Sequence, residues 1–184
     1  MLDKQEDNRF LVWIDLEMTG LDPEENRIIE IATIITDSEL NIVEKGPVDA
    51  IYQTQPVLNR MDKWNRDHHT ATRLIKKVQQ SKLDEKAAED RTIKFLQKYV
   101  KKGTSPLCGN TIYQDRAFLK KYMKELESYF HYRIIDVSSI KELILRWYPA
   151  IPPFKKENTH EALKDILESI EELKFYKANI FKKL

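Results

Sequence analysis

Apolar residues change their spacing along the chain, from short continuous runs typical of strands to the three- and four-residue spacing of helices. Phe10 to Ile14 is a continuous apolar run, which predicts a strand covered on both faces. Arg27 to Thr36 predicts a second strand, which ends at a turn over Asp37 to Glu39. Further strand is expected over Leu40 to Val43 and over Val48 to Tyr52. The chain therefore opens as a meander of strands.

Helices follow in the middle third. Short helices are predicted over Pro56 to Lys63 and over Thr70 to Gln80. A longer one is predicted over Asp84 to Val100, because its apolar residues recur at helical spacing with charges between them.

Strand and helix then alternate to the end of the chain. A strand is expected over Pro106 to Gly109, a helix over Gln114 to Lys124, and a strand over Tyr132 to Asp136. The next helix carries Ile140, Leu143, Ile144 and Trp147 on one stripe and ends at Tyr148-Pro149. A loop over Ala150 to Glu157 and a helix from about Thr159 to Ala178 complete the chain. This order predicts an α/β fold, one domain over residues 1–184 with a central mixed five-stranded sheet flanked by helices. Residues 1–8 are expected to be a flexible N-terminus.

Composition narrows the class of protein. The 184 residues are 41% hydrophobic and 33% charged, with a formal net charge of +1. No apolar run approaches the roughly 20 residues that span a bilayer, and the polar N-terminus is not a signal peptide. The single cysteine, Cys108, agrees with a reducing compartment, so a cytoplasmic protein without membrane contact is expected. Four dispersed glycines exclude a phosphate-binding glycine loop, and the near-neutral charge argues against tracking of long nucleic acid.

Four carboxylates stand at the ends of elements. Asp15 and Glu17 follow the first strand two residues apart, so their side chains point to the same side. Asp115 falls on the buried face of its predicted helix, and Asp165 lies in the last helix. Singly, each is explained by a solvated turn, a helix N-terminus or an exposed helix charge. Together they would repel one another unless neutralised, and oxygen ligands favour hard divalent cations such as Mg²⁺ or Mn²⁺.

His160 precedes Asp165 by five residues, which places the two side chains about 140° apart on a regular helix. With Asn158 or Thr159 as the helix cap, His160 can instead swing over the site that Asp165 faces. A side chain that titrates near neutrality beside a metal is a natural general base for water. The alternative is a histidine in a surface loop.

Six segments carry a family resemblance. They are Trp13 to Asp22, Arg27 to Thr33, Met61 to Asn65, Cys108 to Asp115, Tyr129 to Arg133 and His160 to Ser169. In order and over nearly the whole chain, they resemble the motifs of oligoribonucleases, DEDDh-type 3′-to-5′ exonucleases of the ribonuclease H-like fold. That activity implies a short single-stranded RNA substrate, with dinucleotides and slightly longer RNA degraded to 5′-mononucleotides.

The resemblance also implies roles for individual residues. Two divalent metal ions, Mg²⁺ or Mn²⁺, would bind Asp15, Glu17, Asp115 and Asp165, with His160 as general base. Substrate contacts would come from Met18, Thr19, Leu21, Trp64, His69, Thr111 and Ser138, and from Tyr132 and Arg133 of a second subunit in a homodimer. The chain departs from the family in having Thr111 where serine is usual and Tyr113 where a smaller residue is usual.

Other interpretations stay open at this point. Trp64 can equally be a core residue, and Arg133 a surface ion-pair partner. Cys108 is expected to be a buried, inert thiol, and His68-His69 lacks further ligands at zinc spacing. The rival functions are a DEDDh exonuclease that trims longer RNA or DNA ends and a non-catalytic nucleotide- or RNA-binding module.

Overall fold

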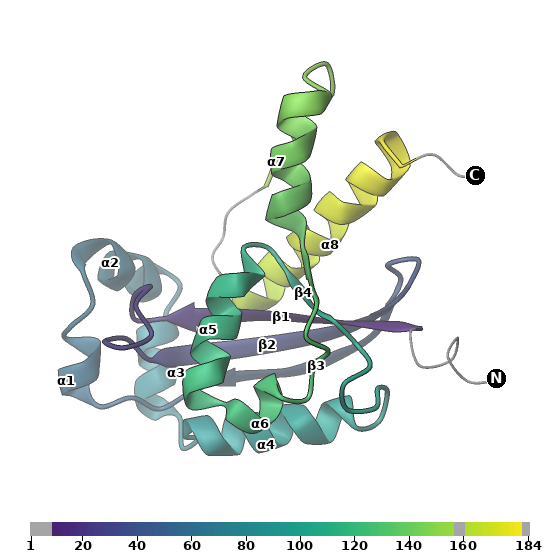
Figure 1. The fold of residues 1–184 in the computed structure, drawn as a ribbon. Coiled ribbons are helices and arrows are strands. Elements are labelled where there is room, and N and C mark those ends of the chain that lie inside the picture. Colours follow the sequence, from purple (N-terminus) through teal and green to yellow (C-terminus); the bar gives the residue numbers. More distant parts are fainter. Residues whose placement is uncertain (1–8, 157–160, 182–184) are drawn as a thin grey trace.

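The structure, a computed structural model, describes residues 9–156 and 161–181. Five strands form one sheet in the order β3-β2-β1-β4-β5 (Figure 1). The strands are β1 (Phe10–Met18), β2 (Ile28–Asp37), β3 (Ile42–Ala50), β4 (Leu107–Gly109) and β5 (Ile134–Asp136). The first three pair antiparallel, whereas β4 and β5 run parallel to β1. The predicted α/β domain with a mixed five-stranded sheet is confirmed; residues 1–8 lie outside the described residues.

Helices cover both faces of this sheet. They are α1 (Gln55–Leu58), α2 (Lys63–Ala71), α3 (Leu74–Gln80), α4 (Glu85–Leu96), α5 (Ile112–Tyr122), α6 (Lys124–Glu127), α7 (Val137–Trp147) and α8 (Ala162–Asn179). In Figure 1, α4 and α6 lie below the sheet, while α7 and α8 rise above it. None of these helices is both long enough and apolar enough to cross a bilayer.

Alternation along β1 divides the core into two layers. Val12 and Ile14 point to the face covered by α4, α5 and α6, where they meet Phe118. Trp13 points to the opposite face and packs with Ile166 of α8. Both layers are buried, as the continuous apolar run predicted, and odd-numbered positions of β1 face α8.

One strand, β3, replaces the two pieces predicted around residues 40–52. Pairing with β2 is interrupted by a register shift at Gly46 and Pro47 and resumes on both sides of it, at Lys45 and at Val48. Proline has no backbone N–H to donate, but β3 is an edge strand and its outer side needs no partner. Phe95 of α4 lies where a side chain at position 46 would stand, so glycine allows that helix to approach.

Two of the predicted helices have different bounds in the structure. Lys63 begins α2 instead of ending the preceding helix, because Asp62 accepts a hydrogen bond from the Asn65 backbone N–H and caps the new helix at 2.8 Å. The helix predicted over residues 70–80 is split between α2 and α3, where Arg73 adopts a left-handed conformation with φ 61°.

The apolar stripe of α7 is only partly buried. Ile144 packs against α8, but Leu143 and Trp147 are exposed, the latter by 66%. Of the predicted stripe, only Ile144 and, in part, Ile140 pack in the core. Leu143 and Trp147 have the spacing of residues on one helix face. Much of α7 extends beyond the sheet in Figure 1, so the sheet does not cover this face.

Glu172 fastens α8 to three other segments. Its side chain is fully buried and accepts hydrogen bonds from Asn110 at 3.0 Å and from the Tyr176 hydroxyl at 2.7 Å. Lys156 forms an ion pair with it at 2.7 Å, and Lys141 of α7 lies at 3.8 Å. A buried carboxylate with this many donors is satisfied, so its removal would leave several polar groups without their partner.

Glu172→Ala is expected to destabilise the fold by about 3 kcal/mol, because the partly buried Lys156 and Asn110 would lose their acceptor. Glu171→Ala is the control: it removes an exposed partner of Lys174 and is expected to cost less than about 1 kcal/mol. Urea unfolding of the two variants measures the difference. Equal losses would contradict the role of Glu172.

Candidate active site

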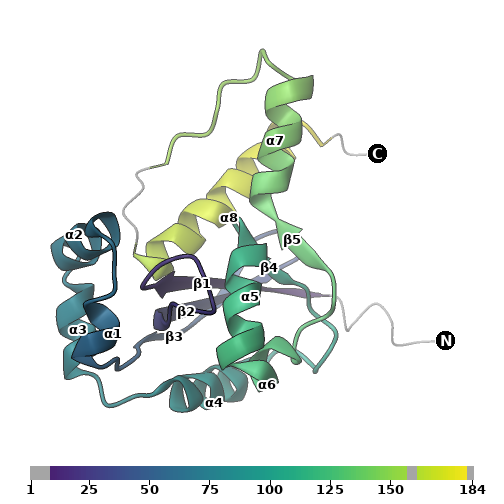
Figure 2. The ribbon, with the colours of Figure 1, turned by 60° about the vertical axis from the view of Figure 1, so that its left-hand side comes forward.

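Three carboxylates converge where β1 ends beside the start of α8. Asp15 and Glu17 stand at odd positions of β1 and therefore face α8, and Asp165 lies in the first turn of that helix. One carboxylate oxygen from each lies within 4.8 Å of the others. Figure 2 shows the beginning of α8 next to the end of β1. The structure thus brings together three of the four predicted metal ligands in one cluster.

Asp115 approaches the same strand from α5. It is 6% exposed, and its Oδ1 accepts a hydrogen bond from the Leu16 backbone N–H at 2.9 Å. Leu16 lies between Asp15 and Glu17, and the Asp115 charge is the largest contribution after burial to the raised pKa of Asp15. Asp115 therefore lies on the Asp15 side of the cluster. Its predicted place on the buried face of the helix, with Phe118 and Leu119, is confirmed.

Glu30 is a fifth carboxylate that the sequence analysis missed. It pairs with Glu17 across β1 and β2, beside a register shift, and is 4% exposed. Its carboxylate accepts a hydrogen bond from the Ala162 backbone N–H, so β2 supplies the cap that Glu161 does not provide for α8. The sequence signal that could have identified Glu30 is its position as a charged residue inside an otherwise apolar strand.

Burial and mutual repulsion raise the pKa of these acids. Desolvation is the largest cause at Asp15, followed by the charges of Asp115 and Glu17. The pKa of Glu17 rises to about 9, chiefly by burial and then through Asp165 and Glu30. Burial raises the pKa of Asp115 to about 7, against the hydrogen bond from Leu16. Without a cation, some of these carboxylates hold protons at neutral pH.

This donor set fits a divalent metal. Every ligand is a carboxylate oxygen, which hard cations such as Mg²⁺ and Mn²⁺ prefer. A second acidic cluster, Glu89, Asp90 and Glu125, differs because Lys86 lies 2.9 to 3.0 Å from all three. A protein cation neutralises that cluster, whereas at the end of β1 three acids meet within 4.8 Å and the pKa values of Asp15 and Glu17 are raised.

A pocket of about 210 Å³ adjoins the carboxylates. Met18, Leu21 and Trp64 line it, as do Gly20 and Asn65, which the sequence analysis did not select. Trp64 is 60% exposed and stacks on His68, with ring centroids 5.0 Å apart, so its interpretation as a core residue is wrong. Exposed flat and apolar side chains beside acids offer a surface for a nucleobase.

Thr19 and His69 are buried behind this pocket. The Thr19 hydroxyl accepts a hydrogen bond from the Arg27 backbone N–H at 3.1 Å. His69 is 1% exposed, and its Nε2 lies 3.1 Å from the Met18 carbonyl oxygen. In this conformation both side chains support the pocket wall.

The other predicted substrate contacts lie outside the pocket lining. Asp136 accepts hydrogen bonds from the backbone N–H of Thr111 and from the backbone N–H and hydroxyl of Ser138, which links the starts of α5 and α7. Tyr132 is 71% exposed, with the Arg133 guanidinium 5.3 Å from its ring centroid. His160, the predicted base, lies outside the described residues.

Cys108 is fully buried in β4, and burial raises the pKa of its thiol. The prediction of a buried thiol is confirmed.

Relatives of known name support a nuclease site. A family model described as an exonuclease matches residues 12–173. Proteins named oligoribonuclease from Shewanella sp. (strain ANA-3) and Shewanella baltica (strain OS155) are 57% and 58% identical over 173 residues. Each alignment covers 94% of this chain and 96% of the relative.

Solved structures with this fold are also exonucleases. Zinc-bound exonuclease I of E. coli in complex with single-stranded DNA matches with a TM-score of 0.72 at 16% identity, over 94% of this chain and 41% of that one. Exonuclease I from Methylocaldum szegediense matches with a TM-score of 0.70 at 18% identity, over 95% and 41%. The chain spans less than half of these two structures, and the likeness shows the fold alone. The predicted ribonuclease H-like fold is confirmed.

The raised pKa of Glu17 predicts how pH acts on the metal-free protein. The folded chain keeps a proton that the unfolded chain releases near the ordinary pKa of 4.5. This contribution to stability is complete below that value and is lost as the pH rises through about 9. The metal-free protein is therefore expected to unfold more easily at about pH 8.5 than at about pH 6, as measured by thermal denaturation.

Glu17→Gln is expected to flatten this pH dependence, because the amide does not ionise. Mg²⁺ is expected to stabilise the unaltered protein more at the higher pH, where fewer protons compete for the carboxylates. An unchanged pH profile in Glu17→Gln would contradict the assignment.

Proposed function

Because the chain belongs to the oligoribonuclease family of exonucleases, we propose that it removes nucleotides from the 3′ ends of very short RNA and releases 5′-mononucleotides. The observation that carries this proposal is the cluster of Asp15, Glu17 and Asp165 beside a small pocket with an exposed tryptophan. The alignment covers 96% of the oligoribonuclease from Shewanella sp. (strain ANA-3), so the chain contains nearly all of the sequence that carries out that protein's activity.

Two divalent ions, Mg²⁺ or Mn²⁺, are the cofactors that the carboxylates support. Asp15, Glu17 and Asp165 would hold one, and Asp15 with Asp115 would hold the second. When bound, such ions supply Lewis-acid activation of water and charge stabilisation at the leaving oxygen. The fold holds these acids in fixed positions, because the Leu16 backbone restrains Asp115 and Glu30 restrains the start of the helix that carries Asp165.

Proton transfer is assigned to His160, because its five-residue spacing from Asp165 matches the family pattern. Its imidazole would accept the proton of the attacking water. The assignment rests on sequence, since His160 lies outside the described residues.

The pocket supports recognition of one terminal nucleotide. Leu21 and Trp64 expose apolar surface on which a base can stack, and Met18 lines the wall next to the carboxylates. We assign Thr19 to the 3′ end and His69, Thr111 and Ser138 to the phosphate. The buried positions of Thr19 and His69 favour a contribution through the pocket wall that they support.

Short substrates are favoured by charge. A chain with a net charge of +1 lacks the broad basic surface that binds many phosphates at once. We place the activity in the cytoplasm, which the single buried cysteine supports.

We further propose a homodimer in which Tyr132 and Arg133 reach the partner's site. Both side chains are exposed, and exposed apolar residues of α7, Leu143, Leu145 and Trp147, offer a surface for association. Tyr129 and Phe130, in contrast, are buried in the core of their own chain. Of the aromatic segment from Tyr129 to Arg133, the residues that can contact a partner are therefore the last two.

Asp15→Asn is expected to lower the rate at least about a hundredfold while the fold persists, because a ligand shared by both metal ions loses its charge. The measurement is cleavage of labelled RNA of about two to ten nucleotides in Mg²⁺, with the shortest substrates cleaved fastest. Asp90→Asn is the matched control, since that acid belongs to the cluster neutralised by Lys86. Near-normal turnover by Asp15→Asn would refute the site.

The same set of substrates separates the rival functions. Preference for longer RNA or for DNA would identify a general 3′-end exonuclease, and binding without cleavage would identify a non-catalytic module.

Mixing two impaired variants tests the shared site. Arg133→Ala is expected to lose most activity, at least about tenfold, because the partner's site loses a cation for the phosphate. A heterodimer of Arg133→Ala with Asp15→Asn contains one site with intact carboxylates and an intact partner arginine. Activity should therefore rise on mixing, above the low activity of either variant alone. No recovery after subunit exchange, or a monomer in light scattering, would refute the arrangement.

A further inference from the structure

The turn after β1 presents Leu21 to solvent beside the carboxylates. This leucine is 73% exposed, so its own packing does not fix its direction. The backbone of residues 19–26 must do so. An apolar wedge that meets a terminal base is useful only when it keeps a constant distance from the reacting phosphate.

Bonds within the turn close its base. The Thr19 N–H donates to the Arg27 carbonyl at 3.0 Å, and the Arg27 N–H donates to the Thr19 hydroxyl at 3.1 Å. The Asn26 side chain accepts a hydrogen bond from the Asp22 N–H at 3.0 Å. A Cβ on Gly20 would lie 2.6 Å from that same Asn26 oxygen, so glycine is needed there for the turn to close.

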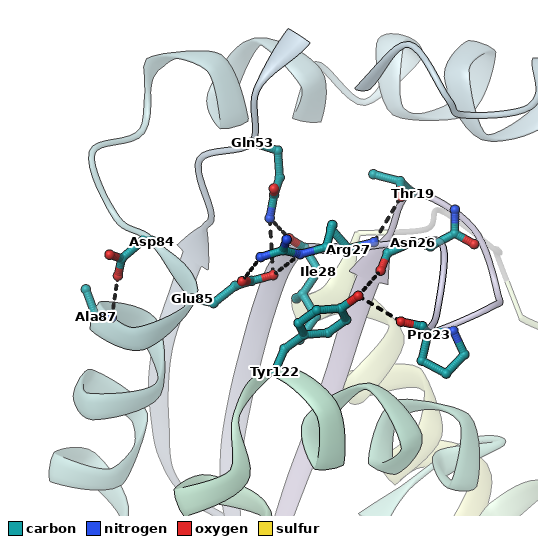
Figure 3. Close-up of polar contacts among 10 residues, drawn as sticks. All are labelled: Thr19, Pro23, Asn26, Arg27, Ile28, Gln53, Asp84, Glu85, Ala87 and Tyr122. Atoms are coloured by element: carbon teal, nitrogen blue, oxygen red, sulfur yellow. Dashed lines mark hydrogen bonds and ion pairs between the residues drawn. The ribbon is translucent and has the colours of Figure 1, made fainter. Parts of the chain in front are cut away.

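Further restraints on the turn come from one helix, α5. The Tyr122 hydroxyl lies 2.7 Å from the Pro23 carbonyl oxygen and 2.8 Å from that of Asn26 (Figure 3). Its single proton serves one carbonyl at a time, yet the two contacts together restrain the second half of the turn. Gln114 donates to the Leu21 carbonyl oxygen from the other end of the helix. The next residue along the chain is Asp115, so α5 holds a metal ligand and the turn together.

Tyr122 is held from behind by an ion pair. The Arg27 guanidinium lies 4.6 Å from its ring centroid and forms two hydrogen bonds with the Glu85 carboxylate (Figure 3). Gln53 bonds the same carboxylate and the Ile28 carbonyl oxygen. The chain of contacts therefore runs from the start of α4 through Arg27 and Tyr122 to the turn.

We propose that Tyr122, backed by Arg27, is a positioning residue that sets Leu21 against the carboxylates and so determines how the terminal nucleotide seats. This inference rests on the proposed function and adds to it a determinant of substrate fit outside the pocket. Within the turn, the Tyr122 hydroxyl contacts two backbone carbonyl oxygens, and its effect reaches the substrate through Leu21.

Tyr122→Phe isolates the hydroxyl, because the ring and its contact with Arg27 are kept. The expected result is a rise of about fivefold in KM for a dinucleotide, with kcat and the Mg²⁺ requirement changed less than about twofold. Tyr129→Phe is the matched control. The Tyr129 hydroxyl also donates to a backbone carbonyl, that of Val100 at 2.8 Å, which does not belong to the turn or to the pocket lining. That variant should lose similar stability and keep the original KM.

A double-mutant cycle with Leu21→Ala supplies the decisive readout. If Tyr122 acts through Leu21, Tyr122→Phe raises KM no further once Leu21 has been truncated. Independent, multiplying effects would overturn the proposal, as would a KM for Tyr122→Phe equal to that of Tyr129→Phe. Failure of the unaltered protein to cleave dinucleotides would instead reject the proposed function.

Discussion

Repulsion among carboxylates at the end of β1 is the constraint on which the site depends. Asp15 and Glu17 are partly buried on one strand face, and Asp165 is brought to them by α8. Burial, and after it the charges of the neighbouring carboxylates, raise the pKa values of Asp15 and Glu17, so the fold keeps these acids together at an electrostatic cost. That arrangement is stable only with protons or cations, and the supporting contacts of Glu30 and Leu16 keep the acids from moving apart.

Much of the site follows from local pattern. The alternation of a strand placed Asp15 and Glu17 on one face, and helical spacing placed Asp115 on a buried face; both predictions agree with the structure. The missed features depend on distant partners. Glu30 caps a helix more than a hundred residues away, and the exposure of Trp147 depends on how far α7 extends beyond the sheet. Neither relation leaves a periodic signal in the sequence.

Errors in the helical region have a different origin. Residues 70–80 have helical composition throughout, yet Arg73 takes a left-handed conformation that divides them into α2 and α3. The break lets α3 pack its Leu74 and Val78 with Met61 in a small separate cluster. Tertiary packing therefore overrides a weak local preference there, as it also does at Pro47, which the sheet tolerates because β3 has a free edge.

Chemical modification of Cys108 can report when the core of the protein opens. It is the only cysteine in the chain, lies fully buried in β4, and pairs in register with Trp13 of β1 and Ile135 of β5. A thiol in this position, packed between the sheet and the helices α7 and α8, meets a labelling reagent only when this layer of the core opens. The rate of its modification therefore measures how often this layer of the core opens.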